Sequence, residues 1–577
     1  MKPFLAMLLF LTLGACAAHK PDAVASAAPA KSTIQKPSYP RLDLSKMQPD
    51  FLFLAAQSAM HEGNPGLAIK LLTALVGKDS TAIIPKMQLI GLLIRFGRID
   101  EAEKHIGQML AHKSLLKSQR EQLQLAEYRI LVAHQQPKLA LQKLAKFLRR
   151  HPANVVARSM QASILAGQGH IDKALASLAA GIHHKESAVL RLLQARLLMT
   201  KGDLTSAKIS LLRIGKLRPD NDIAVLLLSE MAIQSGDKGK AERLLQKFLA
   251  GHPADTRISQ ALARLLVSEK RPTEAILVYR NAITHNGNRP EILRPLGILY
   301  FQNKDYQQAA KTFRTLLELQ PADSNRFYLA ASLEALGQLA EANKLYAKIG
   351  PASPVHTQAQ IRLAAMEVGA NKLNQAEARM LAIVKAKPQQ LGVHLLLTSI
   401  RLDLKQYQQV LDETELLMRL KPLPPQLLFN RAVAFEHFKN YAQVEHIMRR
   451  VIARSPKYAE ALNFLGYTYA EQGIKLGTAR KLILRALQLK PDDGYYMDSL
   501  AWVYYKRGQF SRAAKIQKKA LQLVPNDSIM NDHYGDILWR HGDAQAAREA
   551  WEKALQLKHE HPQLIRKKIS DGLPATR

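Results

Sequence analysis

The sequence predicts an all-α fold, a superhelical solenoid of about fifteen helix-turn-helix repeats. Self-similarity at a period of 20–50 residues is the sequence signature of such arrays. Prolines recur at gaps of one or two units of about 34 residues, and an alanine precedes most of them by twelve residues. No alternation typical of strands recurs along the chain, which disfavours a β-barrel or a sandwich. The prolines are Pro219, Pro253, Pro321, Pro388, Pro422, Pro456, Pro491 and Pro525.

Small residues continue this period along most of the chain. Two antiparallel helices approach closely only where side chains are small, and a following proline ends the second helix because it lacks a hydrogen-bond donor. Glycines at the turn inside each pair accept a left-handed backbone at low cost. The phased residues are Ala68, Ala102, Ala140, Ala174, Ala207, Ala241, Ala275, Ala309, Ala342, Ala376, Val410, Val444, Ala479, Ala513 and Ala547.

Larger residues follow the same period and resemble the tetratricopeptide repeat (TPR) motif, W-x2-L-G-x2-Y, then A-x3-F, then P. Tyrosine and phenylalanine would fill the space between the helices, and each pair would bury its faces against its neighbours. We expect the TPR array to occupy residues 51–570, with a closing helix near Pro562–Ile569. The copy closest to the motif contains Leu296, Gly297, Tyr300, Ala309, Phe313 and Pro321.

The N-terminus has the layout of an export signal. Lys2 precedes an apolar run from Phe4 to Leu13, which is too short to span a bilayer that needs about 20 residues. The run ends in Leu-Gly-Ala-Cys, which resembles the bacterial lipobox, and Cys16 is the only cysteine. By this resemblance residues 1–15 are a lipoprotein signal peptide, and Cys16 carries diacylglycerol and an N-acyl chain such as palmitate. Two or three acyl chains give a stable anchor.

The residue after the cysteine and the following segment predict where the body is held. By the same resemblance to bacterial lipoproteins, Ala17 in place of Asp implies the outer membrane, with the protein facing the periplasm. Residues 16–50 are rich in Ala, Pro, Ser and Lys, a composition that cannot bury enough apolar surface to fold. We expect this segment to be a flexible tether.

The charge balance is strongly basic, with 82 Lys+Arg against 48 Asp+Glu and a net charge of +34. Nucleic acid is the usual inference from such a charge, but an exported protein rarely meets it, and the basic residues form no single block. An anionic polymer of the cell envelope and an acidic protein both fit the charge. Solubility alone would also account for it.

A partner-binding groove is expected on the first helices of the last repeats. Counting back from the phased residues places aromatic side chains beside carboxylates on one inner wall, which suits peptide recognition. This interpretation expects Trp502 and Asp498 to be exposed; the alternative is that several of the aromatic side chains belong to the core between helices. A more basic wall, with Arg196, Arg264 and Arg294, is expected farther toward the N-terminus. The groove residues are Asn463, Tyr467, Tyr495, Asp498, Trp502, Tyr505, Asp532, Asp536 and Trp539.

Motifs of enzymes, cofactors and metal sites are not found in the sequence. G-x-S-x-G, H-E-x-x-H, the Walker A loop and G-x-G-x-x-G are all missing. The tight histidine groups, His183-His184 and His559-Glu560-His561, have no cysteine to complete a metal site, and adjacent histidines on a helix point apart. The sequence therefore predicts a protein that is not an enzyme and has no cofactor and no metal.

The C-terminal repeats resemble a more specific group. The segments Ala461–Ala470, Arg485–Gly494 and Asp498–Tyr505, together with the lipobox, are similar to a proteobacterial family of TPR outer-membrane lipoproteins. One member of that family is the lipoprotein partner of a periplasmic carboxyl-terminal processing protease. The resemblance implies an adaptor that tethers and activates such a protease and presents cell-wall hydrolases to it. The alternative is an assembly lipoprotein of a secretion, pilus or exopolysaccharide-export machine.

Overall fold

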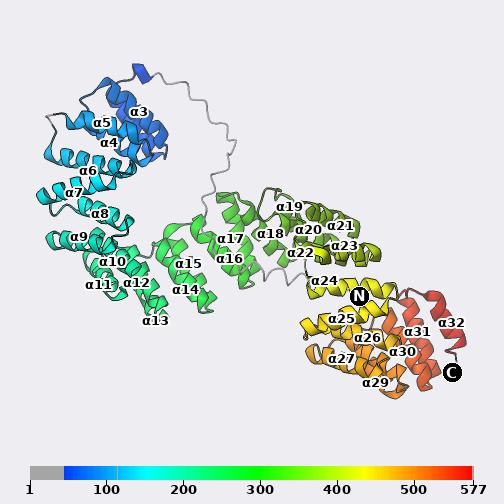
Figure 1. Ribbon diagram of the computed structural model, residues 1–577. Coiled ribbons are helices and arrows are strands. Elements are labelled where there is room, and N and C mark those ends of the chain that lie inside the picture. The colour runs from blue at the N-terminus through cyan, green and yellow to red at the C-terminus, as the bar shows by residue number, and fades with distance from the viewer. Residues whose placement is uncertain (1–43, 113–114, 421, 575–577) are drawn as a thin grey trace. The chain divides into compact units, whose positions relative to one another are not determined.

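The computed structural model describes residues 44–112, 115–420 and 422–574. In this part of the chain 31 α-helices, α2 to α32, follow a short 3-10 helix at Leu44–Lys46, and there is no strand (Figure 1). The predicted all-α solenoid of fifteen helix pairs is confirmed. The expected signal peptide, Cys16 and most of the tether lie outside the described residues. Between residues 44 and 574, apart from the two gaps, no helix is both apolar and long enough to cross a bilayer.

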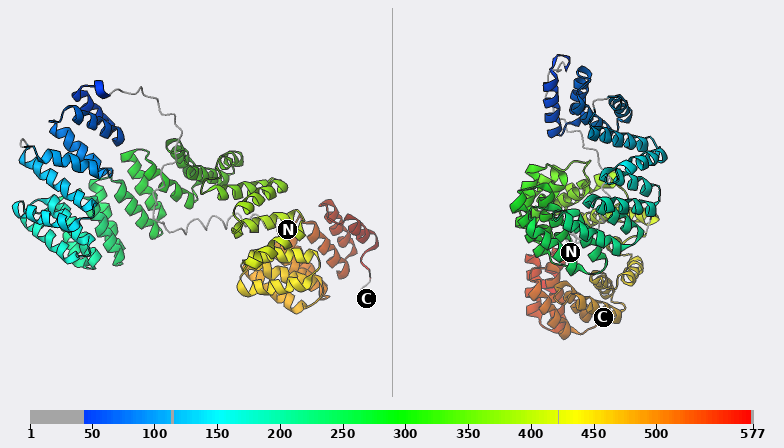
Figure 2. Two further views of the ribbon diagram at one scale, coloured as in Figure 1. Left: turned by 45° about the horizontal axis from the view of Figure 1, so that its top comes forward. Right: turned by 90° about the vertical axis from the view of Figure 1, so that its left-hand side faces the viewer.

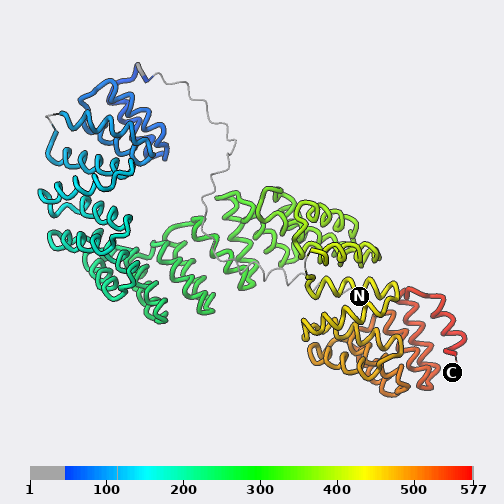
Figure 3. The backbone as a smooth tube through the Cα atoms, in the orientation of Figure 1, coloured from blue at the N-terminus to red at the C-terminus, as the bar shows by residue number. Residues whose placement is uncertain are grey.

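The helices form antiparallel pairs joined by tight turns, and the pairs stack in chain order, as Figures 2 and 3 show. The pairs divide into two units at Gln320 and Pro321. The unit before this boundary contains eight pairs. They are α2 (Pro49–His61) with α3 (Pro65–Lys78), α4 (Ile83–Arg95) with α5 (Ile99–Leu110), α6 (Lys117–Ala133) with α7 (Pro137–Arg150), α8 (Val155–Gly167) with α9 (Ile171–His184), α10 (Ala188–Lys201) with α11 (Leu204–Leu217), α12 (Asp222–Gln234) with α13 (Lys238–Gly251), α14 (Thr256–Ser268) with α15 (Pro272–Asn286), and α16 (Pro290–Gln302) with α17 (Tyr306–Leu319).

The unit after the boundary contains seven pairs and a single final helix, α32 (Pro562–Asp571), which lies where the sequence placed a closing helix. The pairs are α18 (Asp323–Ala335) with α19 (Leu339–Ala347), α20 (His356–Gly369) with α21 (Leu373–Ala386), α22 (Leu391–Asp403) with α23 (Tyr407–Leu420), α24 (Pro425–His437) with α25 (Tyr441–Arg454), α26 (Ala459–Glu471) with α27 (Leu476–Leu489), α28 (Gly494–Lys506) with α29 (Phe510–Leu523), and α30 (Ser528–His541) with α31 (Ala544–Gln556).

The phased residues hold each pair together. All fifteen have an exposed fraction of 0%, and each lies in the second helix of its pair. Several glycines of first helices lie where no side chain would fit, and two of them face aromatic rings of the second helix. A Cβ on Gly297 would lie 2.9 Å from the Phe313 ring, and one on Gly535 would lie 2.3 Å from Trp551 Nε1. These contacts explain why the motif alternates small residues on one helix with large ones on the other.

Local signals fix the helix starts. Asn154 and Asp237 cap α8 and α13, because each side-chain oxygen accepts the backbone N–H three residues later at 2.9 Å. Proline occupies the first turn of α3 and α7, where a missing donor costs nothing. The repeat is therefore marked by local signals as well as by packing.

One second helix departs from the common length. Most second helices have 12–15 residues, whereas α19 has nine and ends at Ala347. Gly350, Pro351 and Pro354 follow, and proline cannot continue a helical hydrogen-bond ladder. The connection to α20 is consequently longer than in neighbouring pairs, and Pro351 from this connection lines a hollow beside α20 and α21.

Candidate functional site

Three first helices of the C-terminal unit, α26, α28 and α30, carry the predicted groove residues. The repeat sets these side chains in rows, since Asp498 and Asp532 are 34 residues apart, as are Trp502 and Asp536. Successive first helices contact one another, so each row runs from helix to helix. The sequence period therefore brings carboxylates and aromatic rings together on one face.

Trp502 is the centre of an aromatic stack. Its ring lies 4.6 Å from the Tyr505 ring and 4.1 Å from the His533 ring, nearly parallel to both. The indole N–H donates a 2.7 Å hydrogen bond to Glu471 Oε2. Lys506 Nζ lies 5.1 Å from the Trp502 centroid, within cation–π range. The position of Trp502 is thus fixed by groups on three successive first helices.

Asp498 lies beneath this stack and orients His533. Its carboxylate accepts hydrogen bonds from Gln517 Nε2 at 2.6 Å and from His533 Nδ1 at 3.0 Å. Burial alone would lower the pKa of His533, but the charge and hydrogen bond of Asp498, with Asp532 and Asp536 nearby, raise that pKa above its ordinary value. The arrangement therefore favours a buried imidazolium that is stacked on Trp502.

A second ion pair connects α30 with the final helix. Lys568 Nζ of α32 lies 2.6 Å from Asp532 Oδ1 and 2.8 Å from Asp536 Oδ1. Trp551 Nε1 donates a 3.0 Å hydrogen bond to Asp536 Oδ1. Burial raises the pKa of Asp536, Lys568 opposes that effect, and the neighbouring Asp532 adds to it. Lys568 thus compensates two carboxylates that would otherwise repel each other.

Tyr467 completes the group on α26. Its ring centroid lies 6.4 Å from that of His533. Burial raises the pKa of its hydroxyl, and the charges of Glu471, Asp498 and Glu436 raise it further, so the phenol stays protonated. We call the following residues the acid–aromatic cluster: Tyr467, Glu471, Asp498, Trp502, Tyr505, Asp532, His533, Asp536 and Lys568.

The expectation that the acids and Trp502 are exposed is wrong. The exposed fraction is 6% for Trp502, 7% for Asp498 and 8% for both Asp532 and Asp536. Each of these aspartates faces a cation or an imidazole, because a buried charge without a partner would cost several kcal/mol. Trp502 thus lies in the packed interior, as the alternative expected for aromatic residues, and the burial of the three aspartates was not predicted.

The remaining predicted residues divide between the face and the packed interior. Tyr467, Tyr505 and Trp539 are partly exposed, and Trp539 lies between the Trp551 ring, at 5.6 Å, and Arg548, at 5.3 Å. Asn463 is half-buried and its side-chain oxygen has no hydrogen-bond partner. Tyr495 packs away from the cluster, against Ala459, Leu462, Ala486 and Tyr496.

Sequence reasoning missed His533, Gln517 and Lys568. Gln517 lies on a second helix, which the groove count did not include. Lys568 follows Asp532 by 36 residues, close to one repeat, so the period could have found it if α32 had been treated as a sixteenth first helix. His533 directly follows Asp532 and was passed over because it is outside the counted positions. Of the residues predicted for a basic wall farther toward the N-terminus, Arg196 and Arg264 are exposed and Arg294 is partly buried.

In the described part of the chain, one set of three side chains is close enough to share a metal ion. Asp100, Glu103 and His134 are exposed, and His134 Nε2 lies 3.2 Å from Glu103 Oε2 and 3.8 Å from Asp100 Oδ1. An exposed ion pair accounts for this arrangement without a metal. In the acid–aromatic cluster Asp498 pairs with His533, and Asp532 and Asp536 pair with Lys568. Carboxylates paired in this way are better suited to holding the helices in place than to transferring protons.

Comparisons with known proteins agree with the helix-pair architecture. Tetratricopeptide-repeat family models match residues 226–291, 266–333 and 499–564. A TPR repeat-containing protein of Pseudomonas aeruginosa, PA4667, is 31% identical over 197 residues, which is 33% of this chain and 33% of that protein. The alignment therefore spans about a third of the relative's length.

Two solved structures of helical-repeat proteins were also similar. A structure of Naa15/Naa10 bound to HypK-THB has a TM-score of 0.29 and 17% identity, covering 75% of this chain and 68% of that one. The APC/C hetero-tetramer Cut9–Hcn1 has a TM-score of 0.34 and 12% identity, covering 91% of this chain and 97% of that one.

Proposed function

We propose that this tetratricopeptide-repeat protein is a membrane-anchored periplasmic scaffold that binds other proteins through the C-terminal unit. Its anchor is lipidated Cys16 at the outer membrane, and its partner is a carboxyl-terminal processing protease that acts on cell-wall hydrolases. The protease and the anchor follow from the sequence resemblance. The C-terminal binding face is supported by the acid–aromatic cluster, whose ion pairs hold a stack of rings in one geometry.

Preorganisation is the reason that this face suits binding. Tyr467, Tyr505 and Trp539 are partly exposed above buried groups that already fix their neighbours. A partner that covers such rings loses little side-chain entropy on binding. Tyr and Trp are also enriched among residues that dominate interface energies. A scaffold needs rigid, partly exposed aromatic groups of this kind.

The test is a crosslinking pull-down from envelope extracts with the full lipidated chain. Tyr505→Ala removes a partly exposed ring of the cluster, whereas Tyr495→Ala removes a ring of the same helix that packs elsewhere. We expect a processing protease in the parent eluate, its loss with Tyr505→Ala, and its retention with Tyr495→Ala. Equal loss with both variants, or no protease with the parent, contradicts the proposal.

The anchor has its own test. Cys16→Ala should leave the protein soluble or as an unprocessed precursor, because the described helices cannot hold it in a bilayer. Fractionation of envelopes measures this directly. Fully processed Cys16→Ala protein that stays in the membrane would refute the lipid anchor while leaving the binding face untouched.

A second candidate partner is an anionic polymer of the cell envelope, and one observation favours it. Helices α27 and α29 contain no Asp or Glu, and seven of their basic side chains are exposed. Such a surface attracts polyanions, with an affinity that falls as salt rises. The basic residues are Arg480, Lys481, Arg485, Arg512, Lys515, Lys518 and Lys519.

Dextran sulfate is a suitable probe of this surface. Changing Lys515, Lys518 and Lys519 to Ala should weaken its binding and its salt dependence, and should leave the protease pull-down unchanged. Unaltered binding of the polyanion by this triple variant excludes the basic surface as its site.

A further inference from the structure

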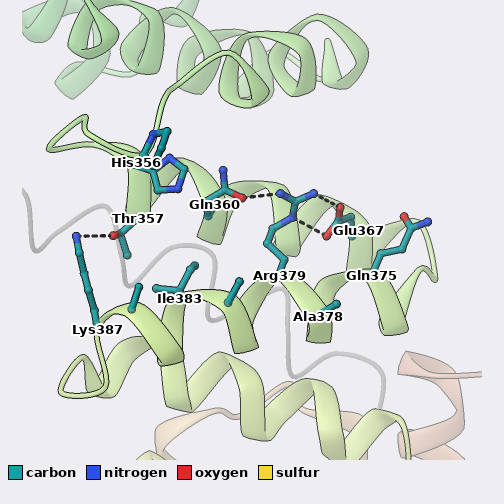
Figure 4. Close-up of a pocket in the computed structure, with 12 residues that line it drawn as sticks. His356, Thr357, Gln360, Glu367, Gln375, Ala378, Arg379, Ile383 and Lys387 are labelled. Atoms are coloured by element: carbon teal, nitrogen blue, oxygen red, sulfur yellow. Dashed lines mark hydrogen bonds and ion pairs between the residues drawn. The ribbon is translucent and has the colours of Figure 1, made fainter.

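A hollow of about 620 Å³ lies between the two helices of one pair, α20 and α21 (Figure 4). It shares no residue with the acid–aromatic cluster. Its floor is formed by Ala378, Ala382, Ala386 and Ile383 of α21. The three alanines are exposed, and their spacing of four residues places them in one line along the helix.

Small side chains lie along this hollow at positions where α27 and α29 carry long ones. Ala378, Ala382 and Ala386 follow the phased residue of α21 by two, six and ten positions. The same positions of α29 hold lysine, lysine and leucine, and those of α27 hold lysine, arginine and leucine. The small volume of these three side chains therefore contributes to the trough along α21.

The hollow has two cationic side chains, and within the described residues only one of them is paired with a carboxylate. Arg379 is neutralised in the middle, since it donates two hydrogen bonds to Glu367 at 3.0 and 2.6 Å and a third to Gln360 at 2.5 Å. At one end, Lys387 Nζ donates to Thr357 Oγ1 at 3.0 Å, and no carboxylate of the described chain lies within ion-pair distance of it. Figure 4 shows Lys387 with Thr357 at one end of the hollow and Arg379 with Gln360 and Glu367 farther along it.

The cationic end also receives the start of α20. Thr357 lies in the first turn of this 14-residue helix, whose N-cap, Val355, supplies no side-chain acceptor. The first-turn N–H groups of a helix carry partial positive charge. His356 is held at the same end by a 3.0 Å hydrogen bond between Nδ1 and Ile349 O. The Lys387 ammonium and the helix start thus add their positive potential at one end of an otherwise neutral, apolar trough.

The dimensions indicate a short peptide. Between Gln375 and Lys387 the helix rises about 18 Å, at about 1.5 Å for each of twelve residues. An extended chain covers that length with about five residues at about 3.4 Å each. Alanines on the floor leave room for apolar side chains of the ligand, and the charge lies at the end of the trough and not along it. The anion of the ligand should therefore stand at the end of its chain.

We infer that this hollow binds the carboxyl-terminal segment of another protein. About five residues with small or branched apolar side chains lie over the alanine line of α21. The terminal α-carboxylate accepts hydrogen bonds from Lys387 Nζ and Thr357 Oγ1. This site lies on the pair α20 and α21 and is independent of the binding face formed by α26, α28 and α30.

The test uses the mature chain on a column and two pools of pentapeptides made from Ala, Val and Leu. One pool has free carboxylates and the other has terminal amides. Lys387→Ala removes the cation, and Lys385→Ala is the matched control, an exposed lysine of the same helix that does not line the hollow. Ala382→Lys gives α21 the side chain that α29 has at this position, and circular dichroism checks that each variant keeps its helices.

We expect the free-carboxylate pool to be retained about tenfold more strongly than the amidated pool, the effect of one hydrogen bond to a charged group. Lys387→Ala should remove that difference, Ala382→Lys should abolish retention of both pools, and Lys385→Ala should change neither. Equal retention of the two pools, no retention of either, or equal effects of Lys385→Ala and Lys387→Ala would overturn the inference.

Discussion

Adding one methyl group at Gly535 should destabilise the C-terminal unit. A Cβ there would lie 2.3 Å from Trp551 Nε1 and 2.4 Å from Trp551 Cδ1, about 1 Å inside ordinary contact distance. Trp551 is fully buried and donates to Asp536, so it cannot move without losing that hydrogen bond. Gly535→Ala therefore forces the indole out of its position.

The change in the free energy of unfolding combines two destabilising effects and one stabilising effect. Overpacking a core costs about 1–3 kcal/mol. Losing the donor to a buried carboxylate costs about 1–3 kcal/mol more. Alanine is about 1 kcal/mol better than glycine inside a helix, which offsets part of both. We expect the free energy of unfolding to fall by about 3 kcal/mol.

Tryptophan fluorescence during denaturant unfolding measures this change. All three tryptophans lie between Trp502 and Trp551, so the signal reports the C-terminal repeats. The control is Gly477→Ala in the first turn of α27, where nothing lies within 4 Å of a new Cβ. It should leave the midpoint unchanged or raise it slightly. A Gly535→Ala midpoint that equals or exceeds the parent's refutes the close packing of α30 on α31.

Two further predictions concern the buried charges. Lys568→Met leaves Asp532 and Asp536 without the cation that pairs with both of them. Because loss of one partner of a buried ion pair is destabilising, the free energy of unfolding of the last helix pair should fall by about 3 kcal/mol. Hydrogen exchange in α30 and α31 measures this change, and unchanged protection contradicts the prediction. His533 has a raised pKa, so its stabilising effect is complete below about pH 6.5 and is lost as pH rises through the higher folded value. The fluorescence midpoint should fall over that range in the parent but not in Asp498→Asn, and parallel pH profiles would contradict this.

The sequence was sufficient for the fold because a repeat imposes the same constraint many times. A single alanine before a proline says little, but at Ala309 and Ala513 the same packing requirement recurs in phase, and both are fully buried. Helix ends were also predictable, because proline and glycine act through the local backbone. Each of these signals depends on neighbours in the same pair.

The candidate site was harder to predict because exposure depends on three helices at once. Counting positions brought Asp498 and Trp502 to the right face, but it could not show that His533, one repeat later, covers both. Nor could it show that α32 returns Lys568 to Asp532. Such contacts join residues that are 31–36 positions apart. No pattern in the neighbouring residues indicates which side chains will meet across that distance.

Buried acidic residues and exposed basic residues occupy different helices of the last repeats. The acids of α28 and α30 are buried and compensated, whereas the charged side chains of α27 and α29 are all basic and exposed. The positions two, six and ten residues after the phased residue are exposed in both α21 and α29, so they are free of the packing constraint that fixes the phased residue. Lysine at Lys519 there makes a cationic surface, whereas alanine at Ala382 makes a hollow, and the fold is the same in both pairs. The surface chemistry can therefore differ at these exposed positions while the buried residue that joins the two helices stays the same.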